Sequence, residues 1–247
     1  MTLKNEYNGS ACQQFEVSNI TEIDNIFVGE NLTLGKMAFY KDKAIFCEND
    51  LSRLNEMIYF VPFNTLESAT ILYIGDRTFN IDSLVDFIPT KFDTVCDVLN
   101  YSLSNKKLIS FNDLKDKQYD LIIVDNKLHE SFYFEDEFLA KIKATLKNDG
   151  IFICSNVDFD NDKESFKSNL SKISSLFRIS MPYKVTTSIN GSGNFIFSSN
   201  KYHPTSDIIL DKSDFLDDCF YYNSEIHLQS FILPNYIKKE LLNIAKN

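Results

Sequence analysis

The sequence predicts an α/β protein in which a small N-terminal antiparallel β-domain precedes a larger domain built on a parallel sheet. Three observations carry this prediction. Short alternating segments fill the first 50 residues, and strands alternate with helices from Ile71 onward. A chain of 247 residues is also long enough for a main domain with one small companion. We therefore expect a β-strand domain over 1–50 and a Rossmann-like domain over 51–247.

The N-terminal part has the pattern of short antiparallel strands. Between Phe15 and Phe46 the chain reads FEVSNI, NIFVG, NLTLG, KMAFY and KAIF, with glycines and Asn, Asp or Lys pairs between the segments. Repeated short strands with turn signals are typical of a small antiparallel sheet. The stretch LSRLNEMIYF that follows spaces its apolar residues as one helical face, and we expect it to link the two domains.

The second part alternates strands and helices. The strands are ILYI, FDTVCDV, YDLIIVD and IFICSN, and the helices are IDSLVDFI, EDEFLAKIKATLKNDG with Gly150 as its stop, and KESFKSNLSKISSLF. Apolar strands that alternate with helices predict a parallel sheet covered on both faces. Together with a short strand at LISF, the strands ISMPYKVTTSI and GNFIFSS would complete a seven-stranded sheet of the methyltransferase type. The tail adds two helical segments around Pro234.

Composition limits the classes of partner. The formal net charge of −10 argues against nucleic acid, because phosphate backbones are held by clustered Lys and Arg. It favours a cationic ligand, or it serves only solubility. No apolar stretch is long enough to span a bilayer, and the N-terminus lacks the apolar middle of a signal peptide, so we expect a cytoplasmic protein without a membrane partner. Five scattered cysteines without a C-x-x-C pair argue against disulfides and a metal site.

Ligands of open parallel sheets bind beyond the carboxyl ends of the strands. The turn YIGDRTFN after the first such strand, with Gly75, has the position of a nucleotide loop. About 20 residues later come Cys96 and Asp97, where an acidic side chain takes ribose hydroxyls in many nucleotide-binding domains. Asp97 is either such a ligand or a solvated residue at a strand end.

Two further strand ends carry candidate residues. Asn112 and Asp113 follow the strand LISF, and they either meet an adenine or form an Asx turn. Asp125 closes the strand YDLIIVD, and it is either a catalytic carboxylate or a turn former. His129, in the next loop, is either a base or a structural residue.

Five segments show a resemblance to a known family, and one of them is the strand entry LKNDGIFI. NEMIYF resembles a helix H-E-M-L-x-H, YDLIIVD resembles Y-D-V-I-I-x-D, INGSGNFIFSS resembles Y-P-S-G-x-W-G-F, and FYYNSEIHLQSFILP resembles Y-Y-N-x-x-x-H-x-x-x-F-x-L-P. Over nearly its full length the chain resembles the spermidine synthase (polyamine aminopropyltransferase) family, most of all its short, divergent epsilonproteobacterial members. Ordinary methyltransferases lack the last segment, whose residues we expect to serve mainly packing and helix capping.

The resemblance implies aminopropyl transfer from decarboxylated S-adenosylmethionine to putrescine or a similar diamine, giving spermidine and methylthioadenosine. The donor is a co-substrate, and no cofactor or metal is implied. The resemblance also implies a homodimer or homotetramer. Asp125 falls on the carboxylate that deprotonates the attacking amine.

Other family positions fall on residues of different type. The G-G-G-D-G-G loop falls on 75–80, so that Thr78 replaces the aspartate that reads the donor's amine. Cys96 replaces the ribose-binding glutamate, and Asn55 replaces the histidine next to the family's substrate-binding tyrosine. The substrate-binding residues implied in this way, together with their neighbours, are Gly75, Asp76, Thr78, Cys96, Asp97, Asn112, Asp113, Asn55 and Glu56.

These departures leave an alternative function open. The chain is either an active aminopropyltransferase or a catalytically inactive relative that binds a nucleoside, a polyamine or a protein partner. A third possibility is an S-adenosylmethionine-dependent methyltransferase, against which the C-terminal segment and the β-domain argue.

Overall fold

The N-terminal part forms two small antiparallel sheets. The computed structural model describes residues 2–7, 11–23, 26–40, 43–66, 69–75, 92–95, 107–108, 111, 114–125, 132–189, 192–214, 216 and 218–247. β1 (Thr2–Tyr7) and β2 (Ala11–Glu16) pair as a hairpin. A second sheet has four strands in sequence order: β3 (Ser18–Ile23), β4 (Ile26–Asn31), β5 (Gly35–Tyr40) and β6 (Lys43–Cys47). The predicted antiparallel β-unit is therefore confirmed.

The main sheet has seven strands in the order β12-β13-β11-β10-β7-β8-β9. All neighbours are parallel except those of β13, which runs antiparallel to both β11 and β12. The strands are β7 (Ile71–Gly75), β8 (Phe92–Val95), β9 (Lys107–Leu108), β10 (Tyr119–Asp125), β11 (Leu146–Asn156), β12 (Ile179–Thr186) and β13 (Ser192–Ser199). This arrangement confirms the predicted seven-stranded sheet of the methyltransferase type.

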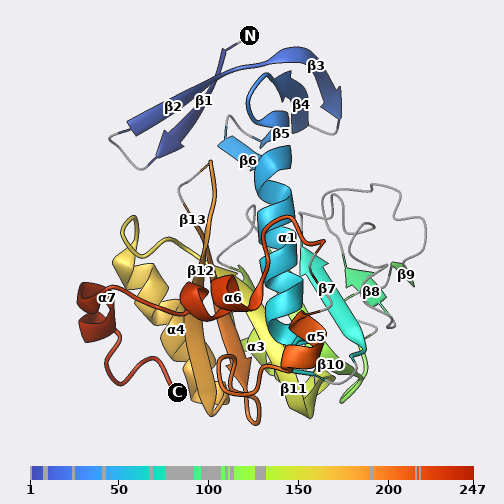
Figure 1. Cartoon of the computed structure of the whole chain (residues 1–247), viewed down its shortest axis with the longest axis vertical. Coiled ribbons are helices and arrows are strands. Elements are labelled where there is room, and N and C mark those ends of the chain that lie inside the picture. Colours follow the sequence, from blue (N-terminus) through green and yellow to red (C-terminus); the bar gives the residue numbers. More distant parts are fainter. Residues whose placement is uncertain are drawn as a thin grey trace.

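Helices cover both faces of this sheet (Figure 1). On one face lie α1 (Glu48–Phe63) and α6 (Ser224–Ser230), with an aromatic core from α1, the strands and the tail. On the other face lie α3 (Asp136–Thr145), preceded by the short 3-10 helix η2 (Phe132–Phe134), then α4 (Lys163–Leu176) and α7 (Asn235–Glu240). Because β7 and β10 are covered on both sides, nearly all of their residues are buried, as their continuous apolar sequences require.

Helix α1 also joins the two parts of the molecule. In Figure 1 it rises from the main sheet to the N-terminal strands. Its carboxylate Asp50 is buried and accepts hydrogen bonds from the backbone N–H groups of Ser188 (2.7 Å) and Ile189 (2.8 Å). Ile189 itself packs into the core of the N-terminal sheet. The loop after β12 is therefore fastened to both α1 and the β-unit.

The end of one helix differs from the expectation. The sequence predicts that the helix after Glu135 stops at Gly150, but α3 ends at Thr145 and β11 begins at Leu146. The carbonyl groups at the end of α3 accept hydrogen bonds from the turn before β10, which ends the helix without a glycine. Gly150 lies within the strand instead, where a Cβ would come within 2.9 Å of the Asp120 carbonyl oxygen.

The tail follows its prediction with one addition. The two segments around Pro234 are α6 and α7, and a short helix α5 (Leu210–Ser213) that we did not predict precedes them. Asn223 caps α6 by accepting the Ile226 N–H at 2.7 Å, as Asp162 caps α4 through Ser165.

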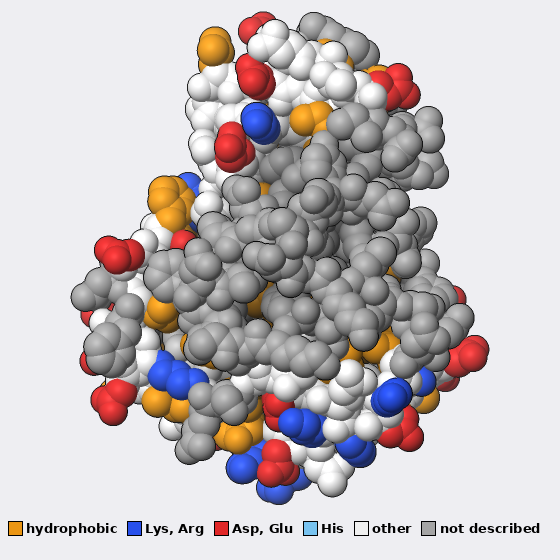
Figure 2. All heavy atoms as spheres, turned by 90° about the vertical axis from the view of Figure 1, so that its right-hand side faces the viewer, with side chains coloured by type: hydrophobic (Ala, Val, Ile, Leu, Met, Phe, Trp, Pro, Cys, Tyr) orange, Lys and Arg blue, Asp and Glu red, His pale blue; other side chains and the backbone are white. Residues whose placement is uncertain are grey.

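The described surface carries charges of both signs. Figure 2 shows basic side chains interspersed with acidic ones at the lower end of the face that it presents. Within the described residues, no helix combines the length and the apolar character needed to cross a membrane. That same part of the chain also contains no cluster of His, Cys, Asp and Glu side chains suited to a metal ion.

Candidate active site at the carboxyl edge of the sheet

Asp125 and Gly75 meet at the carboxyl edge of the sheet. They are the last residues of β10 and β7, two adjacent parallel strands, and they stand opposite each other in the register. Asp125 is only 1% exposed. The structure thus brings together two of the residues that the sequence selects as site candidates, at the place where this class of sheet binds ligands.

Tyr73 is a neighbour of Asp125 that no motif in the sequence marks as a site residue. Its side chain is on the same face of β7 as Gly75, because residues two apart in a strand share a face. Its hydroxyl donates a hydrogen bond to Asp125 Oδ2 at 3.4 Å. Tyr73 also stacks on Tyr59 of α1, with ring centroids 6.2 Å apart. The signal in the sequence was a tyrosine, with its polar hydroxyl, in the otherwise apolar strand ILYIG, two residues before the glycine.

Gly75 leaves the space that this arrangement needs. A Cβ at this position would lie 2.2 Å from the Asp125 carbonyl oxygen and 2.9 Å from the Tyr73 hydroxyl. No side chain fits there without moving the backbone of β10. The glycine is therefore required by close packing within the sheet, in addition to the role expected for it in a nucleotide loop.

Glu56 has backbone partners. The carboxylate is buried on α1 and accepts three N–H hydrogen bonds, from Phe220 (2.8 Å), Tyr221 (2.6 Å) and Tyr222 (2.8 Å). These bonds hold the FYY stretch of the tail against α1. The preceding residue, Asn55, is buried on the same helix. For both residues, contact with a substrate stays a prediction.

A chain of hydrogen bonds connects the end of the FYY stretch with the rest of the tail. Asn64 Nδ2 donates to the Tyr222 hydroxyl (2.6 Å), which faces His227 Nδ1 at 2.8 Å, and His227 Nε2 lies 2.9 Å from the Pro204 carbonyl. Because a carbonyl only accepts, Nε2 carries the proton and Nδ1 accepts from the tyrosine. Burial lowers the pKa of His227 to about 4, so the imidazole is neutral at pH 7.

The FYYNSEIHLQSFILP segment serves packing, as its sequence led us to expect. Tyr222, His227 and Phe231 are buried against the α1 face of the sheet. The helix cap in this segment is Asn223. The segment therefore packs beside α1 through these buried side chains.

Several predicted site residues lie outside the residues that the structure describes. Their places in the fold stay predictions, as does the role of His129. They are Asp76, Thr78, Cys96, Asp97, Asn112 and Asp113.

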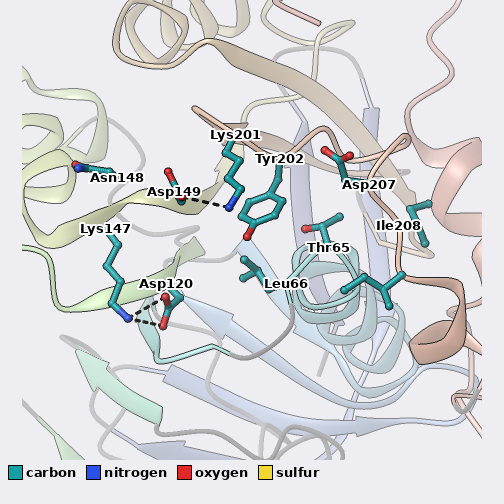
Figure 3. Close-up of a pocket in the computed structure, with 11 residues that line it drawn as sticks. Thr65, Leu66, Asp120, Lys147, Asn148, Asp149, Lys201, Tyr202, Asp207 and Ile208 are labelled. Carbon is teal, nitrogen blue, oxygen red and sulfur yellow. Dashed lines mark hydrogen bonds and ion pairs between the residues drawn. The ribbon is translucent and has the colours of Figure 1, made fainter.

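A hollow of about 1000 Å³ lies at the opposite, amino end of the sheet (Figure 3). Asp120 at the start of β10 forms part of its wall, and Asp125 at the end of that strand is roughly 16 Å away at the usual rise per residue. Its lysines are paired: Lys147 with Asp120 at 2.9 Å and Lys201 with Asp149 at 3.2 Å. The hollow is therefore separate from the edge where Asp125 lies.

Comparison with known proteins finds a family model and curated relatives that are similar to this chain. A family model described as "Spermine/spermidine synthase domain" matches residues 77–209. The polyamine aminopropyltransferase of Helicobacter acinonychis (strain Sheeba) is 27% identical over 236 residues, which covers 82% of this chain and 88% of the relative. The polyamine aminopropyltransferase of Streptococcus uberis is 26% identical over 255 residues, covering 88% and 87%.

Comparison with solved structures gives the same fold. The spermidine synthase from Thermotoga maritima superposes with a TM-score of 0.86 at 23% identity, covering 98% of this chain and 94% of that chain. A spermidine synthase in complex with the transition-state analogue AdoDATO superposes with a TM-score of 0.87 at 23% identity, covering 98% and 95%.

Proposed function

The chain belongs to the spermine/spermidine synthase family, and from this membership we propose that it transfers an aminopropyl group from decarboxylated S-adenosylmethionine to putrescine. The products are spermidine and methylthioadenosine. The observation that carries the proposal is the buried carboxylate of Asp125 at the carboxyl edge of the sheet, opposite Gly75.

The reaction is a displacement at carbon. An amine of putrescine is protonated in water, and Asp125 takes one proton from it, which frees the nitrogen lone pair. The nitrogen then attacks the methylene next to the sulfonium. The new C–N bond forms as the C–S bond breaks, and the bonding electrons return to sulfur, which leaves as the neutral thioether of methylthioadenosine.

The site's electrostatics support a cationic pair of substrates. Both the diamine and the sulfonium donor are positively charged, and a buried carboxylate attracts cations more strongly than a solvated one, because the surrounding dielectric is low. We propose that Gly75, Asp76, Thr78, Cys96, Asp97, Asn112 and Asp113 bind the donor. Asn55 and Glu56, on α1, are proposed for the acceptor side.

The test compares two aspartates of one strand. Asp125→Asn should lower the rate of aminopropyl transfer at least 100-fold while donor affinity stays nearly unchanged, since it removes a general base and keeps the shape. Asp120→Asn makes the same chemical change at the other end of β10, and it should leave the rate within about threefold. Equal rates in wild type and Asp125→Asn would exclude Asp125 as the base.

The second candidate is an inactive relative that retains a binding function. It is favoured by the residues Thr78 and Cys96, which stand where the family has carboxylates. Loss of several charge-assisted hydrogen bonds weakens binding by about 1.5 to 3 kcal/mol each unless neighbours replace them. Binding of methylthioadenosine or of a polyamine without any transfer would favour this candidate.

A further inference from the structure

We propose that Tyr73 is a positioning residue that holds the carboxylate of Asp125 in its reactive orientation; the inference rests on the function proposed above. The Tyr73 hydroxyl contacts Asp125 Oδ2. The two residues come from adjacent strands, 52 residues apart in the chain. The contact is therefore a product of the sheet register and not of local sequence.

The pairing of β7 with β10 directs the Tyr73 hydroxyl toward Asp125. Tyr73 precedes Gly75 by two residues on the same face, and Gly75 is opposite Asp125. The absence of a Cβ at Gly75 leaves room for the phenol tip, which would come within 2.9 Å of such an atom. With any other residue at position 75, the hydroxyl and the carboxylate could not approach in this way.

The rest of the tyrosine side chain is fixed by packing. Tyr73 is 1% exposed, and its ring stacks on Tyr59 at an interplanar angle of 28°. A ring held in this way keeps its hydroxyl within reach of Asp125 at little further loss of side-chain entropy. The donor is therefore in place before substrate arrives.

The chemical effect follows from the charge of the acceptor. A hydrogen bond from a neutral hydroxyl to a carboxylate is stronger than one between neutral groups, and burial strengthens it further. At 3.4 Å the contact is long for an O–H···O bond, as catalytic hydrogen bonds often are before substrate binds. It fixes the rotation of the carboxyl group, so that the lone pair that accepts the amine proton keeps one direction.

Tyr183 on β12 offers a matched control. It is fully buried in the same core, and its hydroxyl has no hydrogen-bond partner among the residues that the structure describes. Tyr183→Phe and Tyr73→Phe thus remove the same atom from equally buried rings. Only the second removes a contact with Asp125.

The first measurement tests the contact without any need for activity. A double-mutant cycle of Tyr73→Phe and Asp125→Ala, read by urea unfolding, should give an interaction of threefold or more in the unfolding equilibrium constant. The same cycle with Tyr183→Phe should be additive. Additivity in both cycles would overturn the inference, whether or not the wild type transfers an aminopropyl group.

The second measurement tests the role in the reaction. Tyr73→Phe should lower kcat about tenfold and leave the KM for the donor within twofold, because the hydroxyl touches the base and not the nucleoside. Tyr183→Phe should retain full kcat. A kcat for Tyr73→Phe within twofold of wild type would overturn the inference. A wild type without transfer would overturn the proposed function instead, and the cycle would still decide the contact.

Discussion

Acid is expected to destabilise the fold through His227. Its Nδ1 accepts from Tyr222 and its Nε2 donates to the Pro204 carbonyl, in a site that is fully buried. A second proton would place a positive charge on a buried ring, where the lost hydration penalises the charged form. Burial accordingly lowers the pKa of His227 from 6.5 to about 4.

The size of the effect follows from proton linkage. The contribution of neutral His227 to the stability of the fold is fully present above pH 6.5. It is lost as the pH falls from 6.5 to about 4, because His227 takes up its proton at a higher pH in the unfolded chain than in the folded one. In this range each pH unit lowers the free energy of unfolding by about 1.4 kcal/mol. Over the roughly 1.5 pH units from pH 6.5 to pH 5, the free energy of unfolding therefore falls by about 2 kcal/mol.

The assay compares unfolding at several pH values. Urea unfolding of the wild type and of His227→Gln from pH 7 to pH 5 isolates the contribution of this one histidine from that of the carboxylates. The variant should be less stable at pH 7, but it should lose about 2 kcal/mol less than the wild type on acidification. Parallel curves for wild type and His227→Gln would show that the pKa of His227 is not lowered in the folded protein.

Three further changes test other contacts. Glu56→Gln should destabilise the protein by about 2 kcal/mol in urea unfolding, because one amide oxygen replaces a carboxylate that accepts from three N–H groups. A loss below about 0.5 kcal/mol would show that these hydrogen bonds do not hold the tail against α1. Gly75→Ala should lower the free energy of unfolding by about 2 kcal/mol and abolish aminopropyl transfer, since the new Cβ would lie 2.2 Å from the Asp125 carbonyl oxygen. A stable, active variant would show that β7 and β10 can move apart to accept a side chain. Asp97→Ala should weaken methylthioadenosine binding tenfold or more if Asp97 takes the ribose, and unchanged calorimetric affinity would exclude that role.

The order of strands and helices was accessible from the sequence because apolar runs and helical faces have distinct periods. YDLIIVD and ILYIG were strands by composition alone, and their ends placed Asp125 and Gly75 at one edge of the sheet. The end of α3 was not accessible. No glycine or proline marks residue 145. The helix ends where its last carbonyl groups accept hydrogen bonds from the backbone N–H groups of the turn before β10.

Long-range contacts explain what the sequence did not reveal about the site. Glu56 meets backbone groups that are more than 160 residues away, so its partners could not be read from local spacing. Tyr73 has the pattern of a core residue in an apolar strand, and only the register with β10 shows that its hydroxyl reaches a carboxylate.

Aminopropyl transfer by this protein can be tested by calorimetric titration with decarboxylated S-adenosylmethionine beside S-adenosylmethionine, followed by product analysis with putrescine. We expect micromolar binding of the decarboxylated donor and formation of spermidine and methylthioadenosine. Failure to bind the decarboxylated donor, with no spermidine formed, would contradict the proposed function.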